Sequence, residues 1–174
     1  MPIRGIDFSK FSLKEALDLA IVVEEEARDR YLELVEQMKQ FRTPDAAALF
    51  EKMARDEELH RTELVRQRRT EIFGQEPSAI TRSMIFDVEA PEYDEARAFM
   101  TQREAVAVAL KSELKAQEFF LGLVEKVNDP EVRELFEELA REEQYHQTLL
   151  RAELARLPED AQLPDDEGDE PVAL

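Results

Sequence analysis

The sequence predicts an all-α protein, a four-helix bundle made of two duplicated helical hairpins joined by a long crossover. Three observations lead to this fold class. Charged residues make up 37% of the 174 residues, aromatic residues only 7%, Trp is absent and Gly occurs 4 times, which is typical of long solvated helices rather than of a sheet. Apolar residues recur at helical spacing in four stretches. The second half of the chain also repeats the pattern of the first.

The first helix is predicted to begin after a short lead-in segment, because Ser12 and Glu15 form a capping-box pattern. An apolar stripe of about seven turns follows, counted at 3.6 residues per turn. The stripe consists of Leu13, Ala16, Leu17, Ala20, Glu24, Ala27, Tyr31, Leu34, Val35 and Met38. Glu24 is the one charged residue in it, so this carboxylate is predicted to face the core.

The second helix is predicted to begin with Thr43 as its N-cap and Pro44 at the first helical position, where a missing N–H does no harm. Its stripe consists of Ala46, Phe50, Met53, Glu57, His60 and Leu64. A carboxylate and an imidazole therefore lie one turn apart on the face that is predicted to be buried. Arginines near the end of the helix suit the helix dipole, and Gly74 is predicted to end it.

Residues 74 to about 100 are predicted to form a crossover packed along the bundle, because the segment is too long for a tight turn and too apolar for a linker. Its apolar residues include Ile80, Met84, Ile85, Phe86 and Val88. At the end of the chain, residues 158–174 are rich in Pro, Gly and acid and are predicted to be a disordered acidic tail. The predicted bundle domain therefore spans residues 1–157.

The third and fourth helices repeat the signals of the first two. Thr101 and Glu104 form a second capping-box pattern, and Asp129 with Pro130 repeats the N-cap and proline of the second helix. The third stripe consists of Val106, Ala109, Leu110, Glu113, Ala116, Phe120, Leu123, Val124 and Val127. The fourth consists of Phe136, Leu139, Glu143, His146 and Leu150. One helix again carries a single Glu and the other carries Glu-x-x-His.

An internal duplication relates the two halves. Residues 12–31 match residues 101–120, and residues 44–60 match residues 130–146. The matched pairs include Glu24 with Glu113, Glu57 with Glu143 and His60 with His146. Each half is thus predicted to be a helical hairpin, and two hairpins related by a pseudo-twofold axis make a four-helix bundle.

Six polar residues interrupt the apolar stripes and form a candidate metal site. They are Glu24, Glu57, His60, Glu113, Glu143 and His146. Burying ionised carboxylates without partners is costly, so the set calls for cations inside the fold. Four carboxylates and two neutral imidazoles would balance two divalent ions. The chain has no Cys, which excludes thiolate zinc and Cys-ligated iron–sulfur centres, whereas carboxylate and imidazole ligands suit iron or manganese.

Each motif also has a plainer interpretation. Among 41 acidic residues, one Glu-x-x-His pattern is weak evidence, because helical Glu is usually solvated and a lone His on an apolar face is usually a core residue. However, both of the 2 histidines in the chain lie in this pattern, at equivalent places in the repeat and on the buried stripe. We therefore predict a dinuclear metal site, with no catalytic residue beyond the metal ligands.

Tyr31 is a candidate neighbour of this site. It lies two turns beyond Glu24 on the same face, where its hydroxyl could hydrogen-bond a ligand or quench a radical. The alternative is a core aromatic residue whose hydroxyl is satisfied elsewhere. Its repeat equivalent is Phe120, so any role of the hydroxyl would break the symmetry of the two halves.

Residues Glu24–Tyr31 and Asp56–His60 resemble the ligand helices of rubrerythrins, in the ferritin-like superfamily. The resemblance covers roughly residues 12 to 155, and the six-residue set is similar to that of di-iron and di-manganese carboxylate bundles. It implies a ferritin-like fold and two iron ions (Fe2+/Fe3+) in a non-haem centre that reacts with peroxide or dioxygen. Such a protein would act in peroxide detoxification or iron homeostasis, and manganese or zinc could replace iron.

The sequence departs from the rubrerythrin pattern in two ways. Rubrerythrins carry an additional carboxylate one turn after the third-helix ligand, where this chain has Ala116. They also carry a Cys-rich rubredoxin module, and this chain has no Cys, so a separate electron donor is expected. The symmetric set is also similar to ferroxidase centres. A ferroxidase or iron-storage component of a larger assembly is therefore an alternative, as is a non-catalytic acidic helical binding module.

Charge and hydropathy bear on partners and location. The formal net charge of -18 argues against nucleic acid and anionic membranes as partners. We expect a cytoplasmic protein, because residues 1–10 do not form a signal peptide and no apolar run approaches the roughly 18 to 20 residues of a membrane span. The resemblance alone implies a homodimer, and the long crossover would permit exchange of hairpins between chains.

Overall fold

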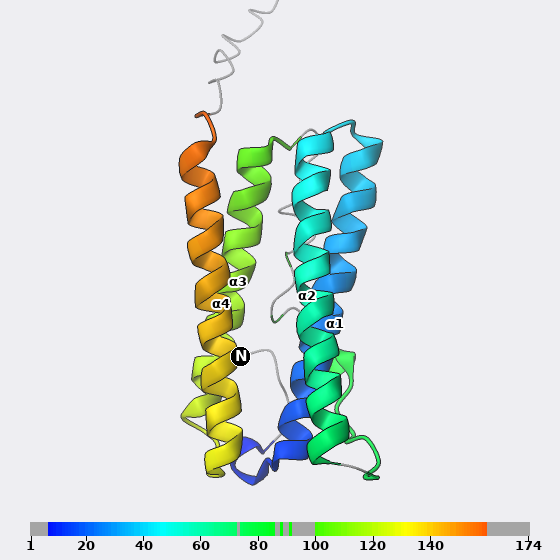
Figure 1. The fold of residues 1–174 in the computed structure, drawn as a ribbon, viewed down its shortest axis with the longest axis vertical. Helices are drawn as coiled ribbons and strands as arrows, with labels where there is room; N and C mark the ends of the chain where they lie inside the picture. The colour runs from blue at the N-terminus through cyan, green and yellow to red at the C-terminus, as the bar shows by residue number, and fades with distance from the viewer. Residues whose placement is uncertain (1–6, 73, 86–87, 89–90, 92–99, 160–174) are drawn as a thin grey trace, which may run out of the picture.

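The computed structural model describes residues 7–72, 74–85, 88, 91 and 100–159. Its long helices are α1 (Leu13–Gln40), α2 (Pro44–Glu71), α3 (Gln102–Val124) and α4 (Pro130–Arg156), and its short 3-10 helices are η1 (Phe8–Lys10) and η2 (Arg82–Met84). The four long helices run along one common axis (Figure 1), which confirms the predicted all-α bundle. Most of the predicted acidic tail, residues 160–174, and Phe86 of the crossover lie outside the described residues.

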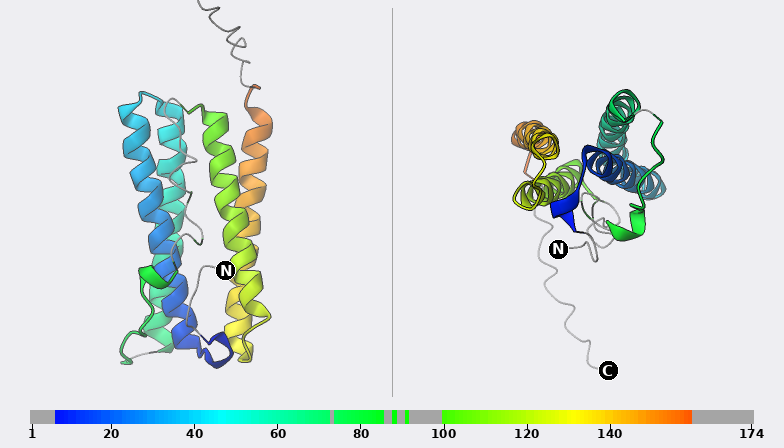
Figure 2. Two further views of the ribbon diagram at one scale, coloured as in Figure 1. Left: turned by 180° about the vertical axis from the view of Figure 1, so that it is seen from behind. Right: turned by 90° about the horizontal axis from the view of Figure 1, so that it is seen from below.

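The bundle consists of two hairpins that lie side by side. Viewed along the axis, α1 and α2 occupy one side and α3 and α4 the other (Figure 2). Packing is most extensive within each hairpin, and contacts between the hairpins join α2 to α3 and α1 to α4. None of the described helices combines the length and the hydropathy of a membrane span.

The helices begin where their capping residues predict. At α3 the Glu104 backbone N–H donates to Thr101 Oγ1 at 3.1 Å and the Thr101 N–H donates to the Glu104 carboxylate at 2.7 Å, so the capping box satisfies both N–H groups. At α4 the Asp129 carboxylate accepts from the N–H groups of Glu131 and Val132. These side chains replace the hydrogen-bond partners that the first turn of a helix lacks.

The C-terminal ends of α2 and α3 can be compared with the ends predicted from the sequence. Helix α2 ends at Glu71, and Gly74 follows with a φ of 75°, a left-handed conformation that glycine adopts without steric cost. Helix α3 ends at Val124, earlier than the apolar stripe that was predicted to reach Val127. Val127 is nevertheless buried, in the same core cluster as Phe120 and Phe136.

The apolar core is divided into two clusters along the bundle axis. The lower cluster, at the end of the bundle where α1 begins, includes Leu17, Ala20 and Val23 of α1, Leu64 of α2, Phe120 of α3, and Phe136 and Leu139 of α4. The upper cluster includes Leu34 and Met38 of α1, Phe50 and Met53 of α2, Val106 and Ala109 of α3, and Leu150 of α4. Between these clusters along each helix lies a glutamate that is completely buried. The fold thus surrounds a charged layer with apolar packing above and below.

The start of the crossover is tied to the first hairpin by a polar cluster. Asp18 of α1 accepts from Arg68 Nε of α2 at 2.7 Å and from the Ser78 backbone N–H at 2.8 Å. The Arg68 guanidinium, and then the Ser78 N–H, lower the pKa of the Asp18 carboxyl against the opposing effect of burial. Further along, Ile85 and Val88 are buried in the lower cluster, as expected for a crossover that packs along the bundle.

Asp18→Ala is expected to destabilise the protein by about 2 kcal/mol, because hydrogen bonds to a charged group typically contribute about 1.5 to 3 kcal/mol each and the variant leaves Arg68 without its carboxylate. The measurement is the urea midpoint of unfolding. Glu36→Ala is the matched control, since Glu36 is an exposed residue of the same helix and its ion pair is with the exposed Lys39. Equal midpoints for the two variants would contradict a structural role for Asp18.

Candidate metal centre

The six residues singled out by the sequence lie together in the middle of the bundle. Each helix contributes to the set: Glu24 from α1, Glu57 and His60 from α2, Glu113 from α3, and Glu143 and His146 from α4. The four glutamates are fully buried, at 0% exposure. They face inward because each occupies a core position of its helix, where helical periodicity leaves no other direction for the side chain.

Short contacts link the imidazoles to the carboxylates. His146 Nδ1 lies 3.0 Å from Glu113 Oε2 and 3.8 Å from Glu143 Oε2. His60 Nδ1 lies 3.7 Å from an oxygen of Glu24 and 3.7 Å from an oxygen of Glu57. The two rings stack with centroids 4.8 Å apart and an interplanar angle of 4°. The two imidazoles therefore lie face to face, each beside two of the carboxylates.

Potential ligand atoms fall into two groups that share a residue. One group is Glu24, Glu57 and His60, and the other is Glu57, Glu113 and His146; within each group one donor atom per residue lies within 4.8 Å of the others. Glu143 adjoins the second group through His146. Two groups of oxygen and imidazole donors around a common carboxylate can hold two neighbouring cations, with Glu57 between them.

The carboxylates of Glu24 and Glu57 lack the hydrogen-bond donors that buried carboxylates need. Neither oxygen of either carboxylate has a hydrogen-bond partner among the described residues. Burial, followed by the charges of the other three glutamates, raises the pKa of the Glu57 carboxyl well above its ordinary value of 4.5. Buried carboxylates without donors are costly unless a cation compensates them. The residues present therefore fit a metal centre.

His60 has an electrostatic environment that favours protonation when no metal is present. Burial opposes the charged imidazolium, but the adjacent Glu24 carboxylate outweighs it and raises the pKa of His60 above its ordinary value of 6.5. A bound cation would compete with this proton, because a coordinating imidazole must be neutral.

Tyr31 lies within hydrogen-bond distance of one of the predicted ligands. Its ring is fully buried, and its hydroxyl donates to Glu113 Oε1 at 3.2 Å. The equivalent position in the second hairpin is Phe120, which packs in the lower core cluster. The hydroxyl thus contacts one carboxylate of the set, and Phe120 has no hydroxyl with which to make the equivalent contact in the other half.

Tyr31→Phe is expected to weaken metal binding by about 10-fold or more while the protein keeps its fold, since residues that orient metal ligands typically contribute 10–100-fold to affinity. A Co2+ titration followed by absorbance gives the affinity, and circular dichroism checks the fold. Tyr145→Phe is the control, because Tyr145 is 62% exposed. If both variants bind Co2+ as the wild type does, Tyr31 is only a core residue.

Gln147 is a polar residue of the site that sequence reasoning missed. It is buried, and its side-chain amide donates to the Glu113 backbone oxygen at 3.2 Å and to Gln117 Oε1 at 2.9 Å. These bonds join α4 to α3 beside two predicted ligands. The residue directly follows His146, but nothing in the sequence distinguishes it from a solvated glutamine. At Ala116, where rubrerythrins carry a further carboxylate, the chain has only a buried methyl group.

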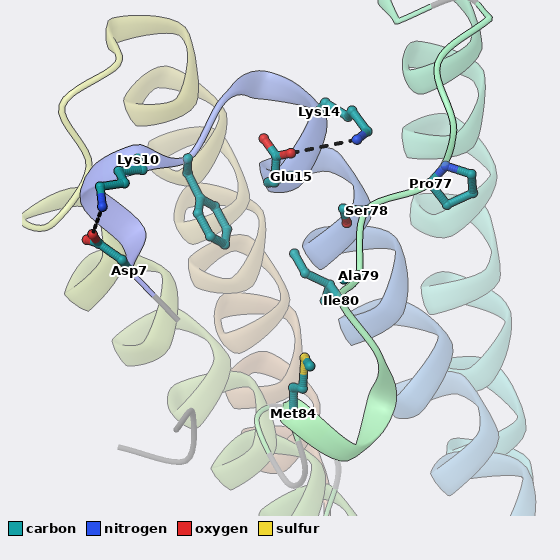
Figure 3. Close-up of a pocket in the computed structure, with 10 residues that line it drawn as sticks. Asp7, Lys10, Lys14, Glu15, Pro77, Ser78, Ala79, Ile80 and Met84 are labelled. Atoms are coloured by element: carbon teal, nitrogen blue, oxygen red, sulfur yellow. Dashed lines mark ion pairs between the residues drawn. The ribbon is translucent and has the colours of Figure 1, made fainter. Parts of the chain in front are cut away.

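A groove at the end of the bundle where α1 begins is separate from the carboxylate layer. It has a volume of about 510 Å³ and lies between the N-terminal segment, the start of α1 and the crossover. Figure 3 shows its two lysines paired with acidic neighbours, Lys10 with Asp7 and Lys14 with Glu15. None of the six predicted ligands lines this groove, so it is not part of the candidate metal centre.

The fold and the inward-facing Glu and His residues define the class: a ferritin-like four-helix bundle with a carboxylate and histidine site that could hold metal. Comparison with protein families then identifies the relatives. The rubrerythrin family matches residues 15–154, and a second match covers residues 104–171. The chain belongs to the rubrerythrin family, whose members are di-iron proteins.

Two solved structures are similar over most of the chain. An uncharacterised conserved protein from Magnetospirillum magnetotacticum MS-1 is 28% identical, with a TM-score of 0.67, and the match covers 87% of this chain and 99% of that one. A hypothetical protein from Pyrococcus furiosus is 27% identical, with a TM-score of 0.53, and the match covers 87% of this chain and 95% of that one. The curated proteins gave no match.

Proposed function

We propose that this protein is a di-iron oxidoreductase that oxidises Fe(II) and reduces hydrogen peroxide or dioxygen. The observation that carries the proposal is the buried layer in which Glu24 and Glu57 have no hydrogen-bond partner and two groups of potential ligands share Glu57. Iron is preferred over zinc because mixed carboxylate and imidazole ligands suit iron or manganese. Family membership supports the same choice.

The proposed ligands are the six residues named from the sequence, namely Glu24, Glu57, His60, Glu113, Glu143 and His146. Two iron ions held by them would supply the two electrons that, with two protons, convert peroxide to two molecules of water. The apolar clusters cover the layer above and below along the bundle axis. Tyr31 holds the Glu113 carboxylate through its hydroxyl.

The electrons that return the centre to its reduced state must come from another molecule. The chain has no Cys, so a separate reductant is part of the proposal. We further propose a homodimer in the cytoplasm. Neither anionic membranes nor nucleic acid suits a protein with a net charge of -18.

The test is anaerobic loading with Fe2+ followed by rapid mixing with hydrogen peroxide. The proposal expects close to two irons per chain and near-ultraviolet absorbance of an oxo-bridged diferric product. It also expects reoxidation much faster than that of Fe2+ in buffer. The His146→Ala variant should lose these properties, whereas Tyr145→Phe should keep them. Protein that binds no iron, or that leaves peroxide unreacted, would overturn the proposal.

A ferroxidase or iron-storage role is the second candidate, and the buried Ala116 favours it, because the centre has no additional carboxylate there. Storage predicts retention of many more than two irons per chain, which one bundle cannot enclose without assembling into a shell. Iron retention after aerobic loading, measured with the assembly mass, separates this role from peroxide reduction. A non-catalytic helical module would instead show equal heat stability with and without metal.

A further inference from the structure

A small groove between α2 and α4 leads from the surface to the carboxylate layer. Its volume is about 130 Å³, room for several water molecules at about 30 Å³ each in the liquid. Helix α2 contributes His60, Glu63 and Gln67 to its walls, and α4 contributes Leu135, Glu138 and Glu142. Both helices lie on the near side of the bundle in Figure 1, and the view from behind in Figure 2 has α1 and α3 in front of them.

The groove reaches the two halves of the centre unequally. His60 lines it, whereas His146 does not. The His60 side chain is 22% exposed and that of His146 is 10% exposed. Behind the His60 ring, at 3.7 Å from Nδ1, lie oxygens of Glu24 and Glu57. These are the completely buried carboxylates that have no hydrogen-bond partner. The groove therefore ends at His60, one imidazole away from these two carboxylates.

The acidic side chains along the groove are suited to a cation rather than to a neutral ligand. Glu63 is paired with Arg66. Glu138 and Glu142, one helical turn apart on α4, form no ion pair or hydrogen bond with the other residues that the structure describes. Glu138 is exposed, and Glu142 is partly buried and closer to the ligands Glu143 and His146. Charge of one sign that lines a low-dielectric hollow concentrates counter-ions there and accelerates their capture.

We propose that the α2–α4 groove is the route by which a divalent cation reaches the centre, passing Glu138 and then Glu142 before it meets His60. This inference rests on the proposed metal centre. The position formed by Glu24, Glu57 and His60 is then the outer one, which fills and exchanges through the groove. The position formed by Glu57, Glu113 and His146 is the inner one, because His146 does not line the groove.

The test compares the rate of Co2+ uptake by metal-free protein, followed by stopped-flow absorbance, with the final Co2+ content. The double variant Glu138→Gln, Glu142→Gln should load about tenfold more slowly at low ionic strength, since electrostatic focusing changes capture rates by about 10–10³. Added salt should reduce this difference. The final content should equal that of the wild type, because neither residue belongs to the proposed ligand set. The control is Glu134→Gln, Glu137→Gln, which removes the same charge from exposed positions of the same helix and should load normally.

A second variant tests the path itself without a change of charge. Gln67→Trp places a bulky ring in the wall of the groove and should also slow Co2+ uptake, whereas Gln40→Trp, on the exposed end of α1, should not. Wild-type loading rates in both the double variant and Gln67→Trp would overturn the route while the metal centre stands. Wild-type protein that takes up no Co2+ at all would overturn the route and the metal centre together.

Discussion

Glu57→Gln is expected to remove most of the metal from the protein and, at the same time, to raise the melting temperature of the metal-free form. Glu57 belongs to both groups of potential ligands, so its loss weakens two positions at once. In the metal-free protein its ionised form is unfavourable, because burial and the other glutamates raise the pKa of its carboxyl. The neutral amide keeps the side-chain volume and removes that cost.

Metal analysis after loading and thermal melts with and without chelator measure both effects. Saturating metal at 100 times its dissociation constant should stabilise the wild type by about 2.7 kcal/mol per ion, and this gain should disappear in the variant. Glu51→Gln is the control, since Glu51 is an exposed residue of the same helix and its loss should change neither quantity. A Glu57→Gln protein with normal metal content would refute the ligand assignment. If metal-free Glu57→Gln melts at a lower temperature than the metal-free wild type, the expected cost of burying the Glu57 charge is contradicted.

The stability gained from bound metal is expected to grow as pH rises from about 5 to about 8, because the coordinating groups must lose their protons. Metal-free protein should show the opposite trend in this window. The pKa of Glu57 is raised above 4.5 in the folded state, so above pH 4.5 the folded state binds more protons than the unfolded state and stability falls as pH rises. The raised pKa of His60 acts in the same direction, since its contribution is present below pH 6.5 and is lost as pH rises through the folded value.

Melting temperatures of chelator-treated and metal-loaded protein, recorded at steps across this range, test the divergence. Surface carboxyls whose pKa is lowered stay ionised across this range, so they do not add to the pH dependence of stability. The arginines beside Glu58, first Arg61 and then Arg28, lower the pKa of its carboxyl to about 2, so it stays ionised throughout the window. Curves for the two forms that run parallel across the range would contradict a metal centre built on these groups.

Much of the fold could be predicted because it depends on local signals. The capping box at Thr101 and Glu104 forms as its spacing predicts, since the hydrogen bonds join residues within one turn. The buried positions of Glu24 and Glu113 follow from periodicity, because a residue on an apolar stripe turns inward with its neighbours. The anchor between Asp18, Arg68 and Ser78 could not be predicted in this way, because it joins residues that are 50 and 60 positions apart.

The sequence by itself determined the four helices, the duplicated hairpins and the six polar residues that face one another, because each depends on spacing within a helix or on the repeat. Only the tertiary structure decided how the two halves differ. His60 and His146 are equivalent in the repeat, yet their shortest carboxylate contacts are 3.7 Å and 3.0 Å, and His60 alone lines the groove between α2 and α4. Those distances and that opening depend on how helices from different hairpins pack, and packing between hairpins is not encoded in the period of any one helix.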